Sequence, residues 1–132
     1  MENKIYHLSS AEMKERKKSL EIDESLFLIE IDGKTIHTRA EYLAIVSKLC
    51  RFPISSCNFD SYEDWMTDLS WLKKDAYAII IYNFSHFLDQ DTESKGFVME
   101  GFSELLLPWW EGDVEKHVVD GKAKPFNVYL VE

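Results

Sequence analysis

The sequence predicts an α/β fold with a small three-stranded parallel sheet and helices packed on it. Three compact apolar runs, at residues 26–31, 76–82 and 126–131, are typical of buried strands. Amphipathic segments with a helical period lie between these runs, so the strands are joined by helices rather than by tight turns. Such crossovers indicate parallel strands, and we expect the crossovers to be right-handed.

The elements around the first two strands follow from local signals. Asp32-Gly33 ends the first strand with a turn, and Thr38 is a suitable N-cap for a helix from about residue 39 to residue 49. Phe52-Pro53 ends that helix and begins a loop. Residues 76–82 are the most apolar run of the chain, which predicts a central strand covered on both faces.

The region before the last strand is less regular. Residues 83–96 predict a loop with one helical turn, and residues 97–107 predict an amphipathic helix that ends at Pro108. Trp109 and Trp110 then follow the helix. Our first interpretation is that these two indoles form a lid on the core, and the alternative is an exposed surface for a partner.

Length and composition indicate one domain with an N-terminal extension. A chain of 132 residues with 45% hydrophobic content can build a single core. Ser9 to Glu12 has the form of a capping box and precedes a short, highly charged helix. We therefore divide the chain into an extension at residues 1–25 and an α/β domain at residues 26–132.

The charge of the chain limits its partners. With 15 basic and 24 acidic residues the net charge is −9, which disfavours nucleic acid and anionic membranes and favours a basic protein. The first residues lack the apolar core of a signal peptide, and no run approaches the ~20 apolar residues of a membrane span, so we expect a cytoplasmic protein. The five glycines are isolated, which excludes glycine-rich phosphate loops.

Cysteine and histidine give no sign of a metal centre or of another cofactor. Cys50 and Cys57 lie seven residues apart, a spacing compatible with a disulfide or with the reduced thiols of a cytoplasmic protein, and we interpret both as packing residues. The four histidines are scattered singly. We therefore expect neither a metal site nor a cofactor.

Residues 58–72 are the most informative stretch, because they predict a helix with an apolar face and an acidic face. The apolar face comprises Phe59, Tyr62, Met66, Leu69 and Leu72, and the other comprises Asp60, Asp64, Asp68 and Trp71. Asn58 is in the N-cap position, and Asp60 gains from the helix dipole. Like charges four residues apart cost roughly 0.2–0.5 kcal/mol per pair. The stripe therefore indicates either a solvated acidic face or a surface for a cationic partner.

Between about Phe27 and Val131 the chain resembles the barstar-like family, inhibitors of barnase-type ribonucleases. The resemblance is carried by Ile29 to Gly33, Phe52-Pro53, the Asn-x-Asp-x-x-x-Asp pattern at Asn58, Asp60 and Asp64, Ile79 to Ile81, and Val128 to Val131. It implies an intracellular inhibitor of a ribonuclease or a related basic toxin. The acidic helix and the loop before it would occlude the active site of the target.

The resemblance also implies a set of contact residues and a single basic partner. It assigns Asp60 and Asp64 to the basic cleft of the target as charged anchors. The complete set of expected partner-binding residues comprises Asp60, Asp64, Glu63, Asp68, Trp71, Ser55, Ser56 and Asn58. We expect a 1:1 complex, a monomer when free, and no catalytic residues.

The chain departs from the family pattern at several positions, which leaves a second function open. Glu63 stands where the family presents a tryptophan, and Ile54, Ser55 and Ser56 replace a contact tyrosine, while residues 111–124 look like an insertion. The alternative is a barstar-fold interaction or regulatory domain with a non-ribonuclease partner. An enzyme that uses Asp60 and Asp64 as acid and base is disfavoured, because no nucleophile or concave site is indicated.

Overall fold

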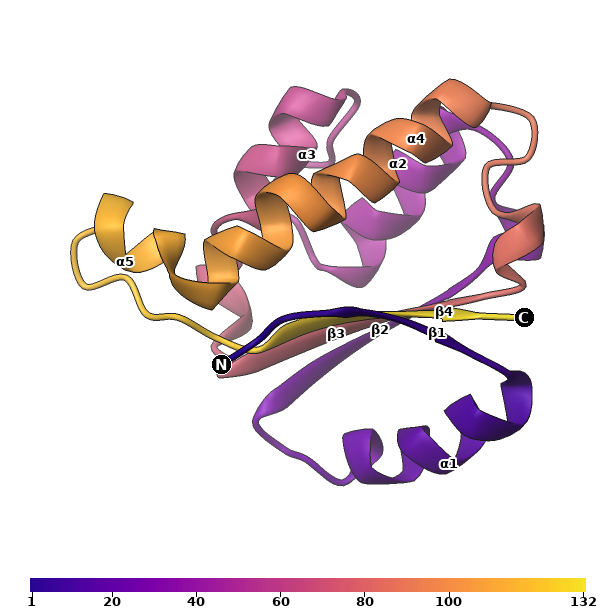
Figure 1. The fold of residues 1–132 in the computed structure, drawn as a ribbon. Coiled ribbons are helices and arrows are strands. Elements are labelled where there is room, and N and C mark those ends of the chain that lie inside the picture. Colours follow the sequence, from indigo (N-terminus) through magenta and orange to yellow (C-terminus); the bar gives the residue numbers. More distant parts are fainter.

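The computed structural model describes residues 1–132 and shows a four-stranded parallel sheet with helices on both faces (Figure 1). The strand order is β1-β4-β3-β2. The strands are β1 (Ile5–Leu8), β2 (Leu26–Asp32), β3 (Ala76–Tyr82) and β4 (Phe126–Val131). The predicted α/β class, the three predicted strands and their parallel pairing are confirmed, and β1 is an additional strand.

The helices are divided unequally between the two faces of the sheet (Figure 1). Helix α1 (Ser10–Glu21) covers one face alone. Helices α2 (Arg39–Leu49), α3 (Phe59–Met66) and α4 (Thr92–Gly101) cover the other, and α5 (Val114–His117) lies beyond the sheet. None of these helices has the length and apolar character needed to span a membrane.

Strand β1 pairs with the outer edge of β4 along its whole length, from Ile5 opposite Val128 to Leu8 opposite Val131. Tyr6 stacks on Tyr129 of β4, with ring centroids 5.0 Å apart. Four residues with mixed polarity give no strand signal of their own. The strand exists because β4 offers unpaired backbone groups at its edge.

Helix α1 closes the sheet face behind β1. Its one buried residue, Met13, is 1% exposed. Met13 belongs to a small apolar cluster with Ala78, Ile80, Tyr129 and Val131. Lys17 Nζ also lies 2.7 Å from Glu30 Oε1 of β2, an ion pair that links the helix to the sheet. Residues 1–25 thus supply a strand and a helix that pack on the sheet.

The main core lies between the opposite sheet face and helices α2, α3 and α4. Alternate residues of β3 point to the two sides: Tyr77, Ile79 and Ile81 join the main core, and Ala78 and Ile80 join the small cluster. This alternation confirms that β3 is covered on both faces.

The helix that follows β3 is longer than predicted. It begins at Thr92 and continues past Pro108 to His117, through the π-helical stretches η4 (Phe102–Leu106) and η5 (Trp109–Asp113). The predicted end at Pro108 is wrong. The wider π turns on either side let the chain accommodate a residue that lacks an N–H group and whose ring would clash inside a regular α-helix.

Candidate protein-binding site

Helix α3 begins where the sequence predicts and ends earlier. The Asn58 side chain accepts a hydrogen bond from the backbone N–H of Ser61 at 2.8 Å, which confirms the predicted N-cap. The helix ends at Met66, so the prediction of one helix to residue 72 is wrong. Leu69 is buried with φ 54°, in the left-handed region that no helix can continue through.

Two distant tryptophans stabilise this early end. Trp110 Nε1 donates a hydrogen bond to the carbonyl oxygen of Met66 at 3.0 Å, and Trp109 Nε1 donates one to that of Thr67 at 2.8 Å. The last carbonyl groups of a helix lack partners within the helix, and here the indoles supply them. Trp110 is buried in the main core and Trp109 is half-buried against it, in agreement with a lid on the core.

Three carboxylates, Asp60, Glu63 and Asp64, lie together on α3 and form what we call the acidic ridge. Asp60 and Asp64 are exposed, and Glu63 is half-buried. Asp68, which was predicted to extend the stripe, lies beyond the helix, where Oδ1 accepts a hydrogen bond from the Ser70 N–H at 3.3 Å. The acidic face is therefore shorter than the sequence indicates.

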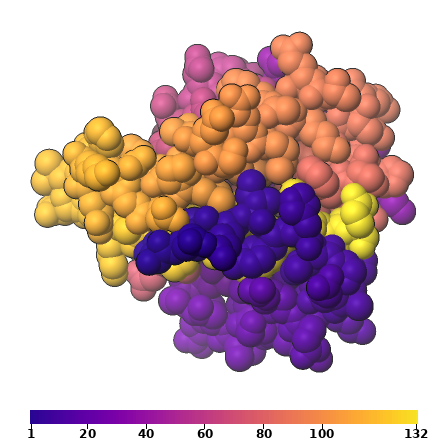
Figure 2. All heavy atoms as spheres, in the orientation of Figure 1, coloured from indigo at the N-terminus to yellow at the C-terminus, as the bar shows by residue number.

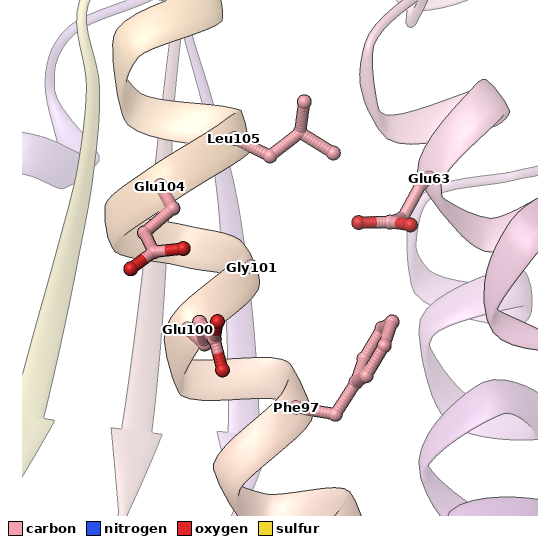
Figure 3. A pocket seen from close by; sticks show the side chains of 6 residues that line it. All are labelled: Glu63, Phe97, Glu100, Gly101, Glu104 and Leu105. Atoms are coloured by element: carbon pink, nitrogen blue, oxygen red, sulfur yellow. The ribbon is translucent and has the colours of Figure 1, made fainter.

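Helix α4 and its π-helical continuation add two carboxylates across a groove from the acidic ridge (Figure 3). A hollow of about 380 Å³ between the helices is lined by Glu63, Phe97, Glu100, Gly101, Glu104 and Leu105. An adjoining hollow of about 340 Å³ is lined by Asp60, Glu63, Asp64, Thr67, Leu105 and Trp109. Glu100 and Glu104 were not predicted as site residues, although their four-residue spacing on a predicted helix is the signal that would find them.

The electrostatics of the groove favour a cationic partner. Burial raises the pKa of Glu63 above its ordinary value, and the neighbouring carboxylates of Asp60 and Asp64 raise it further. None of the five carboxylates of the ridge and the groove forms an ion pair within the protein. The site therefore holds an excess of negative charge that the fold leaves uncompensated.

The loop before α3 is fixed by hydrogen bonds to its neighbours. Ser56 is buried, and its N–H donates to the Ser47 hydroxyl at 2.9 Å. The Ser56 and Ser61 hydroxyl groups lie 2.9 Å apart and share a hydrogen bond. Ser55 and Ile54 are exposed beside them, and Ile54 was not predicted as a contact. The loop thus offers the surface of Ser55 and Ile54 on a rigid base.

Trp71 packs against the protein more closely than predicted. Its Nε1 donates to the carbonyl oxygen of Cys50 at 2.9 Å, and its ring packs edge-on against Trp65 with centroids 5.4 Å apart. Trp65 is half-buried against the main core. Both cysteines are free; Cys50 is a packing residue as predicted, whereas Cys57 is exposed and that interpretation is wrong for it.

No group of three or more histidine, cysteine, aspartate or glutamate side chains is arranged to hold a metal ion. The chemistry that the site does provide is a set of carboxylate acceptors around a shallow groove. Such acceptors form charge-assisted hydrogen bonds with arginine and lysine. The arrangement is suited to binding a basic surface.

Comparison with protein families gives one match. A family model described as Barstar (barnase inhibitor) matches residues 26–130, which include β2, β3, all of β4 except Val131, the acidic ridge and the groove. No curated protein and no solved structure matches the chain. The strand β1 and the helix α1 lie outside the matched residues. The family model covers most of the chain, and the chain belongs to the barstar family.

Proposed function

We propose that this protein inhibits a ribonuclease or a related basic toxin by covering its active site with the acidic ridge and the loop before α3. The observation that carries the proposal is the set of five unpaired carboxylates around the groove between α3 and α4. Membership of a family described as barnase inhibitors supports the same function.

The cost of the acidic ridge to the free protein supports a binding role. Asp60 lies three residues from Glu63 and four from Asp64, and like charges at these spacings destabilise a helix by roughly 0.2–0.5 kcal/mol per pair. A partner that brings arginine or lysine to the ridge removes this repulsion and gains charge-assisted hydrogen bonds. The field of a protein with a net charge of −9 also accelerates encounter with a basic partner.

The contact residues differ in how they would act. Asp60 and Asp64, which are exposed, are the charged anchors, and Glu63 faces the groove. Ser55 and Asp68 are exposed beside the two ends of α3. The remaining predicted residues, Ser56, Asn58 and Trp71, are held by hydrogen bonds within the protein, and we assign them to positioning the loop and the helix.

We further propose that the protein is a monomer when free, forms a 1:1 complex, acts in the cytoplasm and is not an enzyme. Occlusion requires no covalent step and no cofactor. The two free thiols fit a reducing compartment.

The test is an inhibition assay with a purified barnase-type ribonuclease. We expect the wild-type protein to abolish RNA cleavage at one equivalent, and Asp64→Asn to require at least about tenfold more protein, because an anchor charge is lost at nearly constant shape. Glu24→Gln is the matched control: it removes one exposed charge that lies outside the ridge and the groove, and should inhibit like the wild type.

Full ribonuclease activity in the presence of excess wild-type protein would contradict the proposal. Binding that leaves the activity intact would instead favour a barstar-fold interaction domain with a non-ribonuclease partner. Equal inhibition by Asp64→Asn and the wild type would show that the acidic ridge is a solvated face.

A further inference from the structure

The acidic ridge alone is too small for a stable protein interface. Helix α3 has eight residues, which span about 12 Å at 1.5 Å per residue. A stable interface covers about 800 Å² on each partner and involves roughly 20–30 residues a side. A protein that covers the ridge must therefore contact neighbouring elements as well.

One neighbour is the segment 114–121, here called the C-terminal arm, which consists of α5 and the loop after it. Figure 2 shows this part of the chain projecting from one side of the molecule. The indoles of Trp109 and Trp110, just before the arm, bind the last carbonyl groups at the end of α3. The arm is thus fastened to the end of the acidic ridge.

A continuous surface connects the ridge to the arm. A hollow of about 380 Å³ lies between them, with Thr67 and Asp68 in its lining on the α3 side and Val114 and Val118 on the side of the arm. Thr67 also lines the hollow that contains Asp60 and Asp64. Because Thr67 lines both hollows, a footprint that is centred on the ridge and extends past the end of α3 reaches the arm.

The arm presents two adjacent apolar side chains to solvent. Val118 is 45% exposed and Val119 is 92% exposed. The loop that holds them is tight: the Val118 N–H donates to the Val114 carbonyl oxygen at 3.0 Å, and the Gly121 N–H donates to that of Val118 at 2.9 Å. A Cβ atom added at Gly121 would lie 2.6 Å from the Val114 oxygen, so the turn is closely packed. The backbone that carries the valines is held in place before binding, which lowers the entropy lost on association.

The charges beside the valines are of both signs. Asp68 and Asp120 line the hollow, together with Lys122 and Lys124. Lys124 Nζ donates to the Lys74 carbonyl oxygen at 2.6 Å, and Lys122 Nζ lies 4.0 Å from Asp75. Lys124 binds a neutral carbonyl group and keeps its charge, so two lysines and two aspartates leave the hollow close to neutral, and the contact that the arm offers is apolar.

We propose that the C-terminal arm is a second, apolar contact for the basic protein that binds the acidic ridge, with Val118 and Val119 packing against apolar side chains beside its cationic cleft. This inference rests on the proposed function. It assigns a role to a segment that the resemblance leaves as an insertion, and it makes the arm a determinant of which basic partner binds.

The test measures the dissociation constant of a purified barnase-type ribonuclease for four proteins: the wild type, Val119→Ser, the double variant Val118→Ser/Val119→Ser and Ile22→Ser. We expect the double variant to bind about tenfold more weakly, mainly through faster dissociation, because two valines no longer bury apolar surface. Ile22→Ser is the matched control: Ile22 is 80% exposed and follows α1 on the opposite face of the sheet. Its affinity should stay within about twofold of the wild type.

The outcomes separate this inference from the proposed function. Wild-type affinity in the double variant would overturn the role of the arm and leave the inhibitor function standing. No binding by the wild type would overturn both. A wild-type dimer that becomes monomeric in Val119→Ser would assign the valines to self-association and would also overturn the inference. Because Val119 is 92% exposed and Ile22 is 80% exposed, Val119→Ser and Ile22→Ser should unfold at the same urea concentration as the wild type.

Discussion

Replacing Met13 by alanine tests whether the two faces of the sheet stabilise one cooperative fold. Met13 is 1% exposed and is the one buried residue of α1. Truncation of a methionine buried to that degree to alanine lowers the free energy of unfolding by about 2–5 kcal/mol, and the loss depends on how far the site can collapse around the cavity. The cluster around Met13 is small and lies under a single helix, so we expect about 2–3 kcal/mol.

The assay is urea unfolding followed by tryptophan fluorescence. All four tryptophans lie on the opposite side of the sheet, in or against the main core. A loss of about 2–3 kcal/mol at Met13 should shift their unfolding midpoint only if residues 1–25 and 26–132 unfold together. Ile22→Ala is the matched control, because Ile22 lies in the same segment and is 80% exposed, and it should leave the midpoint unchanged. A midpoint in Met13→Ala equal to that of the wild type would contradict a single cooperative fold and would show that residues 1–25 are an independent extension.

Three further predictions concern titratable groups. Burial and then the neighbouring carboxylates raise the pKa of Glu63, so ionisation of Glu63 destabilises the native state as the pH rises through that pKa. Glu63→Gln should therefore raise the melting temperature at pH 7 but not at pH 4. The same variant should bind the partner more weakly. The 2.8 Å hydrogen bond from His37 Nδ1 to Asp89 raises the pKa of His37 above 6.5. The stabilisation of the fold by this pair is therefore present below pH 6.5 and is lost as the pH rises through the raised pKa of His37. An NMR titration of His37 should show the raised pKa, and Asp89→Asn should remove the shift. A thiol reagent should modify one cysteine in the native protein, Cys57, and both after unfolding, because burial raises the pKa of Cys50 to about 12; modification of both in the native state would contradict the structure.

The parts of the fold that the sequence predicts correctly are those with a strong local signal. The three apolar runs form β2, β3 and β4, because short apolar runs rich in β-branched and aromatic residues and bounded by turn signals favour strands of a parallel sheet. The N-caps Thr38 and Asn58 were also predicted, since a side chain that accepts from the first turn acts over three residues of sequence.

The parts that were missed depend on contacts between distant residues. Strand β1 is too short to be recognised alone and forms only on the edge of β4. The end of α3 is set by Trp109 and Trp110, more than 40 residues away, so no local pattern marks it. Because α3 ends at Met66, Asp68 does not lie on the acidic face of the helix. Glu104 lies on a helix that the sequence predicts, but its place in the groove depends on how that helix packs beside α3.

The most direct test of the proposed function is a calorimetric titration of the wild-type protein and Asp64→Ala against a barnase-type ribonuclease at low and at high salt. We expect one-to-one binding that weakens as the salt concentration rises. The binding free energy of Asp64→Ala should be less favourable by more than about 2 kcal/mol, because a cationic side chain of the partner loses the carboxylate of Asp64 as its counter-charge. Equal affinities of the two proteins, or binding that is independent of salt, would contradict the claim that the acidic ridge is the anchor of the complex.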